Sequence, residues 1–64
     1  MIEIGTKYLY QTDRFAYIPV TVTAVDGEWL YILCDLGSHF YTVEGWRTGI
    51  WIRRDEPALL DYTV

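Results

Sequence analysis

Apolar and polar residues alternate with a period of two over most of the chain, which is the pattern of β-strands. The clearest example is Pro19–Asp35, PVTVTAVDGEWLYILCD, in which β-branched residues precede Asp26-Gly27 and aromatic and aliphatic residues follow. Asp-Gly between two such runs is a strong signal for a β-hairpin. The pattern therefore predicts strands over Tyr17–Val25 and Glu28–Leu36. No 3.6-residue apolar period lasts beyond one turn, so no long helix is expected.

The register of this hairpin decides which side chains are buried, because a shift of one residue exchanges the two faces of a strand. Three alternate residues of the first strand share a face in either register: Val20, Val22 and Ala24. A two-residue turn at Asp26-Gly27 sets that face beside Trp29, Tyr31 and Leu33. A three-residue turn over Val25–Gly27, with Gly27 in the left-handed position of a G1 bulge, sets it beside Leu30, Ile32 and Cys34. The second register sorts aliphatic from aromatic residues more cleanly, so we expect it, with the aliphatic face buried.

Shorter alternating runs predict three further strands, at Ile2–Gln11 with a kink at Gly5, at His39–Glu44 and at Ile50–Arg54. Polar or glycine-containing segments separate the strands: Gln11–Ala16, a turn at Gly37-Ser38, and a loop over Gly45–Gly49. After Asp55-Glu56, proline predicts a single 3₁₀ turn over Pro57–Leu60 that tucks Leu59 or Leu60 under the sheet, and the last residues, DYTV, suit a short edge strand. We therefore expect an all-β protein: one domain over residues 1–64, folded as a five-stranded small barrel with one short 3₁₀ turn near the C-terminus.

Composition limits how such a small domain is stabilised. A chain of 64 residues buries only about 60% of the surface of its unfolded state. The single cysteine and single histidine exclude an intramolecular disulfide and a closed zinc site of Cys and His ligands. Aromatic residues remain, three Trp, six Tyr and two Phe, each able to bury roughly 150–250 Å². They predict a core held by aromatic packing, or a protomer that associates.

The net charge of −4 excludes some partners. Residues 1–46 hold two bases, Lys7 and Arg14, against six acids, and residues 47–64 hold three arginines against three acids. Such a balance lacks the basic surface that non-specific nucleic-acid binding requires. No run of about 18 apolar residues suits a membrane span, and the N-terminal MIEIGTKY lacks the apolar segment of a signal peptide. With one lone thiol, these features predict a cytoplasmic protein that binds neither membranes nor nucleic acid non-specifically.

The order of elements resembles the SH3-like small barrels, including Tudor-type domains and related bacterial and phage domains. The matching segments are the opening IxxGTKYLY, the hairpin VTVTAVDGEW and the late turn DEPALL. Short phage-encoded proteins are similar to the VTVTAVDGEWLYI pattern, which implies a partner that is a host enzyme, a host defence protein or a virion component. The chain departs from the signalling SH3 type, since KYLYQ stands where that type has an ALYDY-like strand. Proline-peptide binding is therefore not carried over.

Five residues form the predicted partner-binding surface: Trp29, Tyr31, Tyr41, Trp46 and Arg47. Trp and Arg are enriched in binding hot spots, and Trp29 and Tyr31, two apart, share one face of a strand. Three interpretations stay open. The aromatic residues pack the core or a homo-oligomer interface, they bind another protein, or they form a cage for a cationic ligand, as Tudor-type domains do.

No constellation of residues predicts catalysis. Ser38, His39 and Asp35 lie close in sequence but provide neither an oriented nucleophile nor an oxyanion donor. Arg53 and Arg54 point to opposite faces of a strand and cannot clamp one phosphate. We therefore expect a non-catalytic protein-binding module without metal or cofactor, with the structural homo-oligomer as the alternative and the cationic-ligand cage as the third reading.

Overall fold

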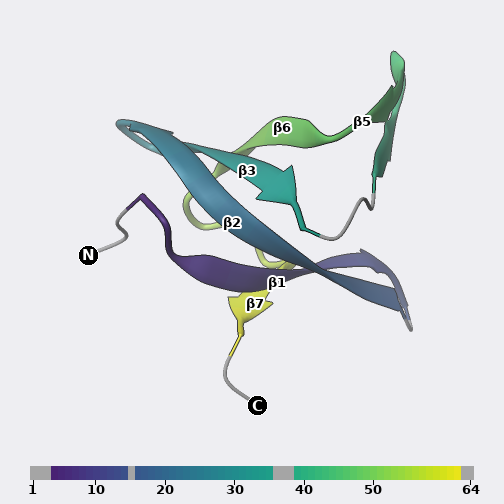
Figure 1. Cartoon of the computed structure of the whole chain (residues 1–64), viewed down its shortest axis with the longest axis horizontal. Helices are drawn as coiled ribbons and strands as arrows, with labels where there is room; N and C mark the ends of the chain where they lie inside the picture. Colours follow the sequence, from purple (N-terminus) through teal and green to yellow (C-terminus); the bar gives the residue numbers. More distant parts are fainter. Residues whose placement is uncertain (1–3, 15, 36–38, 63–64) are drawn as a thin grey trace.

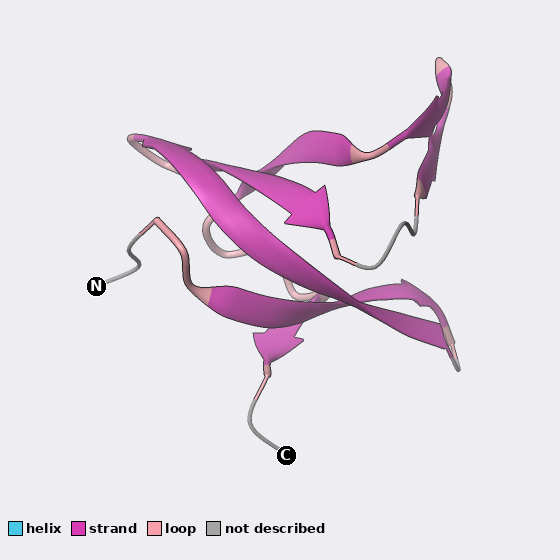
Figure 2. Ribbon diagram, in the orientation of Figure 1, coloured by secondary structure: helices cyan, strands magenta, loops and turns pink. Residues whose placement is uncertain are grey.

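The computed structural model describes residues 4–14, 16–35 and 39–62, and this part of the chain contains β-strands and turns but no helix. The strands are β1 (Lys7–Asp13), β2 (Ala16–Asp26), β3 (Trp29–Cys34), β4 (Phe40–Thr42), β5 (Gly45–Arg47), β6 (Gly49–Arg53) and β7 (Leu59–Asp61). The all-β prediction is confirmed (Figure 2). The predicted turn at Gly37-Ser38 lies outside the described residues, as do the last two residues of the chain.

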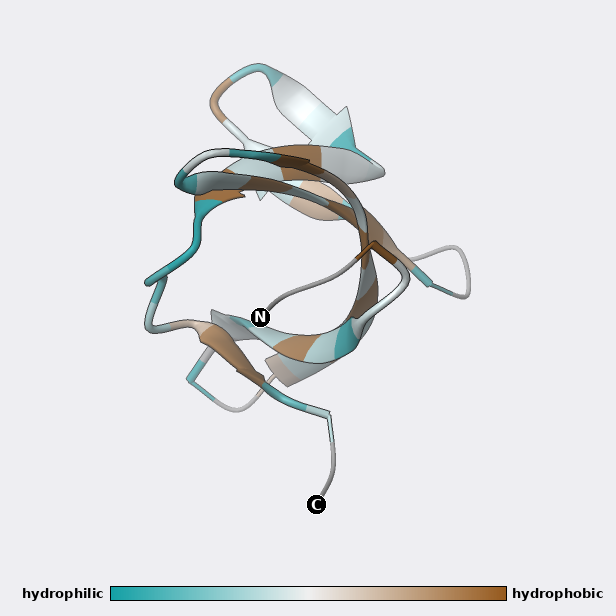
Figure 3. Cartoon of the chain, turned by 90° about the vertical axis from the view of Figure 1, so that its left-hand side faces the viewer, coloured by the Kyte–Doolittle hydropathy of each residue, from teal (hydrophilic) through white to brown (hydrophobic). Residues whose placement is uncertain are grey.

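Five strands form one antiparallel sheet in the order β6-β3-β2-β1-β7, and β4 pairs with β5 in a separate hairpin (Figure 1). The last strand, β7, returns to pair with the first, β1. The sheet is so strongly curled that its ribbon traces an open ring in end view (Figure 3). Among the described residues no ladder joins β6 to β7, so these are the two edges of the sheet. Residues 54–58 connect one edge to the other.

The β2–β3 hairpin has the predicted faces over the half that lies away from its turn. Val20 pairs with Cys34 and Val22 with Ile32, so the aliphatic residues share a face as expected. Leu30 and Ile32 are fully buried, which confirms their prediction, whereas Cys34 is only half-buried. The two-residue turn at Asp26-Gly27 would have placed Val20 and Val22 on the face opposite to Leu30, Ile32 and Cys34.

The predicted three-residue turn over Val25–Gly27 is wrong. Strand β2 continues to Asp26, which pairs with Trp29, so the turn consists of Gly27 and Glu28. Gly27 has the predicted positive φ, at 60°. A two-residue turn with a left-handed glycine suits the right-handed twist of the flanking strands, which favours this tighter connection.

A β-bulge at Thr23, between the pairs Val22↔Ile32 and Ala24↔Tyr31, takes up the extra residue. The bulge advances the alternation of β2 by one position. Ala24 therefore leaves the aliphatic face and lies beside Tyr31 on the outer face, contrary to the prediction. Bulges also increase local twist, which fits the strong curl of this sheet.

The core lies inside the curl. Its buried side chains come from four strands, and the set is Val20, Val22, Leu30, Ile32, Phe40 and Ile52. Partly buried residues pack against it, among them Tyr8, Tyr10, Ile18, Ile50 and Leu59. Tyr10 and Phe40 meet edge to face with ring centroids 5.2 Å apart, which attaches the β4–β5 hairpin to β1. Burial of each large aliphatic side chain contributes roughly 1.5–3 kcal/mol to the free energy of unfolding.

The predicted loop over Gly45–Gly49 is instead the strand β5, a one-residue bend at Thr48 and the start of β6. Phe40 of β4 pairs with Arg47, and Tyr41 with Trp46. The connecting turn is held by the Thr42 hydroxyl, which donates to the carbonyl of Gly45 at 2.8 Å and accepts from the Glu44 amide at 3.1 Å. The local hydroxyl bonds stabilise a turn that lacks the usual Asn-Gly or Asp-Gly pair.

The predicted 3₁₀ turn over Pro57–Leu60 is not present. The amide of Leu59 donates to the carbonyl of Glu56 at 3.1 Å, and the chain enters β7 directly at Leu59. The sequence predicted that either Leu59 or Leu60 lies under the sheet. Leu59 does so and packs against the core, while Leu60 on the opposite face is exposed. Pairing with β1 extends the chain where an isolated turn was expected.

An ion pair on the outer face joins three strands. The Lys7 ammonium donates to the Asp35 carboxylate at 2.9 Å and to the Thr21 hydroxyl at 3.1 Å, and that hydroxyl donates to Asp35 at 2.9 Å. The hydrogen bond from Lys7 holds the pKa of Asp35 below its usual value, with a further contribution from Thr21. This network links β1 to the middle of β2 and to Asp35, the residue that follows β3.

Candidate functional site

Aromatic side chains line the outer face of β3 and β6. Tyr31 lies opposite Trp51, and their rings meet at a centroid distance of 5.2 Å and an angle of 62°. Trp29 lies opposite Arg53, whose guanidinium carbon is 5.6 Å from the Trp29 ring centroid. Arg53 thus occupies one face of Trp29, where a cationic ligand would otherwise bind. Trp29 and Trp51 remain about half exposed.

The Tyr31 ring is positioned by a glycine. A Cβ at Gly49 would lie 2.5 Å from the Tyr31 hydroxyl oxygen and 2.7 Å from both Tyr31 Cε2 and Leu33 Cδ2. These separations are shorter than side chains tolerate. The absence of a side chain at Gly49 therefore allows the tyrosine to lie across β6.

A second aromatic group stands on the β4–β5 hairpin. Tyr41 and Trp46 are cross-strand partners, with ring centroids 5.0 Å apart at an angle of 65°. Both are strongly exposed, at 75% and 63%. Val43 in the adjoining turn is fully exposed. Large apolar side chains held at the surface in this way are typical of surfaces that contact another molecule.

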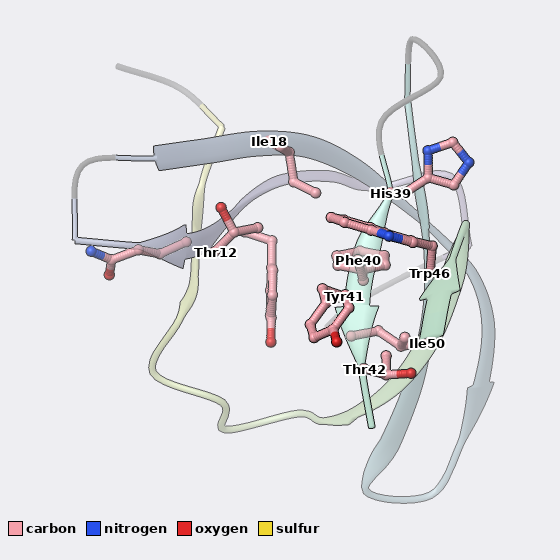
Figure 4. Close-up of a pocket in the computed structure, with 10 residues that line it drawn as sticks. Thr12, Ile18, His39, Phe40, Tyr41, Thr42, Trp46 and Ile50 are labelled. Atoms are coloured by element: carbon pink, nitrogen blue, oxygen red, sulfur yellow. The ribbon is translucent and has the colours of Figure 1, made fainter. Parts of the chain in front are cut away.

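The Tyr41–Trp46 pair borders a cleft of about 350 Å³ between the hairpin and the strands β1, β2 and β6 (Figure 4). Tyr10, Ile18, Phe40 and Ile50 form its apolar wall, and Gln11, Thr12, His39 and Thr42 add polar groups. Burial raises the pKa of Tyr10, and the nearby Glu56 carboxylate raises it further, so its phenol remains protonated at neutral pH. None of the described residues that line the cleft is acidic.

The five predicted binding residues do not form one surface. Trp29 and Tyr31 lie on the outer face of the main sheet. Trp29 begins β3 at the β2–β3 turn, and this end of β3 is the one far from the β4–β5 hairpin (Figure 1). Tyr41 and Trp46 lie together at the cleft. Arg47 follows Trp46 on a strand and so points to the other face of the hairpin, where its guanidinium donates to the Trp46 carbonyl at 3.0 Å.

Sequence reasoning missed Trp51 and the cleft. The alternation of Ile50, Trp51, Ile52 and Arg53 could have identified Trp51, because buried isoleucines imply an outward tryptophan between them. No local signal could have found the cleft, since Tyr10, Ile18 and Ile50 come from three separate strands. Only the fold brings them to the hairpin.

The described residues contain no group of three His, Cys, Asp or Glu side chains that could hold a metal ion. Burial, and then the neighbouring Asp35 carboxylate, raise the pKa of the Cys34 thiol, which disfavours the nucleophilic thiolate.

No helix among the described residues is long and apolar enough to cross a membrane. Comparison of the chain with protein-family models, with curated proteins and with solved structures found no match.

Proposed function

We propose that this chain is a non-catalytic protein-binding module of the SH3-like class, and that the cleft beside the β4–β5 hairpin takes up part of a partner protein. The strand order supports the class, because β1, β2 and β3 form an antiparallel meander that β6 extends, and the last strand returns to pair with the first. The exposed Tyr41–Trp46 pair at the mouth of an apolar cleft is the observation that carries the proposed function.

Binding of this kind draws on the burial of the two rings. An aromatic pair that is already in contact loses little conformational freedom when a partner covers it. The apolar wall formed by Ile18 and Ile50 receives an apolar side chain of the partner, and the rim residues Thr12 and His39 supply hydrogen bonds. Arg47, on the other face of the hairpin, would orient a partner that wraps around the hairpin edge. The phage resemblance would make that partner a host protein or a virion component.

The test compares capture of the partner from a lysate of the source cells by the wild type and by three variants. Tyr41→Ala and Trp46→Ala should each lose about 2 kcal/mol or more of binding free energy, as hot-spot truncations do. Tyr17→Ala is the matched control, since Tyr17 is also about half exposed but does not line the cleft. Urea unfolding shows whether the three variants are equally well folded. Equal capture by all four proteins would contradict the proposal.

The homo-oligomer remains the second candidate, and one observation favours it. Besides the cleft residues, Trp29, Trp51 and Tyr17 are each about half exposed, which is a large apolar surface for a chain of 64 residues. An assembly that buries both Trp29 and Trp46 would replace binding of another protein by self-association. Trp46→Ala separates the two candidates, because it should abolish self-association in such an assembly but leave the mass in solution unchanged if the cleft binds another protein.

A further inference from the structure

The two edges of the main sheet differ in how well they are protected from pairing with another strand. β7 has three residues, follows Pro57 and ends in Asp61, features that discourage added strands. β6 has five residues, contains no proline and has Arg53 as its only charged residue. Among the described residues β3 is the only strand paired with β6. The other side of β6 therefore pairs with no strand that the structure describes, and it faces away from the sheet in Figure 1.

Hydrogen bonds at the two ends of the β3–β6 ladder show which backbone groups of β6 face that open side. The amide of Arg54 donates to the carbonyl of Glu28 at 2.7 Å, and the amide of Cys34 donates to the carbonyl of Thr48 at 2.8 Å. Hydrogen-bonded residues alternate in an antiparallel ladder. The even-numbered residues of β6 therefore bond to β3, and the odd-numbered residues direct their N–H and C=O groups outward.

The outward residues are Gly49, Trp51 and Arg53, placed symmetrically about the middle of the strand. We propose that a second copy of this chain pairs with β6 through these groups, antiparallel and about a two-fold axis at Trp51. In that register Trp51 bonds to the second copy's Trp51, and Gly49 bonds to the second copy's Arg53. One acceptor is shared, because the carbonyl of Arg53 already accepts from the Glu56 amide at 3.1 Å. The dimer joins two five-stranded sheets into one.

The side chains of β6 fit this register. A hydrogen-bonded antiparallel pair brings its Cα atoms to about 5.5 Å, so the two half-exposed Trp51 rings become neighbours on the outer face. Gly49 has no side chain to oppose the second copy's Arg53. The two copies of Arg53 lie four positions apart along the ladder, about 14 Å at the usual rise per residue, which exceeds the screening length of roughly 8–10 Å.

Charge favours the same arrangement at the two ends of the ladder. Asp55 follows β6 by two residues and Arg47, the last residue of β5, precedes it by two, and both are exposed. The antiparallel relation therefore brings Asp55 of one copy to the same end of the ladder as Arg47 of the other. Asp55 already lies 3.6 Å from Arg53 of its own chain, which neutralises part of the positive charge at that end. Each end of the ladder thus carries an acidic residue of one copy and a basic residue of the other, while the two copies of Arg53 stay separated. The proposed dimer goes beyond the proposed function. The dimer is tested by the mass of the protein in solution and the function by capture of a partner protein, so either proposal can fail without the other.

A charge-exchange experiment tests the register. Sedimentation of the wild type should shift from 7.5 kDa to twice that mass as concentration rises. Trp51→Lys and Trp51→Glu should each remain monomeric, because the two-fold axis places residue 51 beside itself and like charges in opposite positions repel. An equimolar mixture of the two variants should recover the doubled mass. Tyr17→Lys, a control on an exposed residue away from β6, should dimerise like the wild type.

Three results would overturn the proposal: a wild type that stays at monomer mass at every concentration, a dimer that persists in either variant alone, or a mixture that stays monomeric. Hydrogen exchange of the wild type provides a check that needs no variant. The amides of Trp51 and Arg53 should exchange more slowly in concentrated than in dilute solution, while the amide of Asp61, which faces outward on the other edge strand, should not change. Exchange at Trp51 that is independent of concentration would equally exclude pairing at this edge.

Discussion

Replacement of Gly49 by alanine should destabilise the protein by a steric mechanism that can be traced to two side chains. The added Cβ would lie 2.5 Å from the Tyr31 hydroxyl oxygen and 2.7 Å from Leu33 Cδ2. Tyr31 cannot simply rotate away, because its ring is already packed against Trp51. Overpacking of this kind costs about 1–3 kcal/mol, and the lower entropy of the unfolded alanine variant offsets about 0.4–1 kcal/mol of it. The expected net loss is about 1–2 kcal/mol.

Urea unfolding followed by tryptophan fluorescence in dilute solution measures this loss as a lower midpoint with an unchanged slope. The melting temperature should fall by about 4–8 °C for each kcal/mol in a chain of this size. A double-mutant cycle with Tyr31→Ala identifies the cause. In the Tyr31→Ala background the cost of Gly49→Ala should shrink, since two of the three close contacts are gone and only that with Leu33 remains. An alanine variant as stable as the wild type, or a cost unchanged by Tyr31→Ala, would refute this reasoning.

Two further predictions concern stability. Gly27→Ala should cost about 1–2 kcal/mol because φ is +60° and a Cβ is strained there; Gly27→Asn should cost less, since asparagine tolerates this region, and equal unfolding midpoints for the three proteins would contradict this. The lowered pKa of Asp35 means that its ion pair with Lys7 stabilises the fold above the usual carboxyl pKa and ceases to do so as pH falls through the lowered value. Because Lys7 is 53% exposed, the loss should be only about 0.5 kcal/mol, and Asp35→Asn should remove this step from the pH dependence of urea unfolding.

The sequence by itself determined the strands and much of their sorting. Alternation over Tyr17–Val25 and over the residues after Gly27 identified β2 and β3, because a strand with one buried face must alternate whatever it packs against. The positive φ of Gly27 and the burial of Leu30 and Ile32 follow from the same local pattern. The candidate residues Tyr41 and Trp46 were identified by type, as exposed aromatic residues in a short segment.

Tertiary structure decided the features that depend on residues far apart in the chain. The bulge at Thr23 moves Ala24 to the outer face, and strand propensity gives no signal for where a ladder takes up an extra residue. Pairing of Leu59 with Tyr10 replaced the predicted 3₁₀ turn by β7, because ladder hydrogen bonds to a distant strand outweigh a local turn preference.

The candidate site shows the same division most clearly. Trp29 and Trp46 are both tryptophans that the sequence marks for binding, yet they lie on different surfaces, because β3 belongs to the main sheet and β5 to a separate hairpin. Phe40, packed edge to face on Tyr10, fixes where that hairpin stands. The cleft exists only because this contact holds the Trp46 ring next to Ile18, a residue 28 positions away in the chain. Alternation is a local property that the sequence carries, whereas the docking of one sheet on another depends on packing that no local pattern encodes.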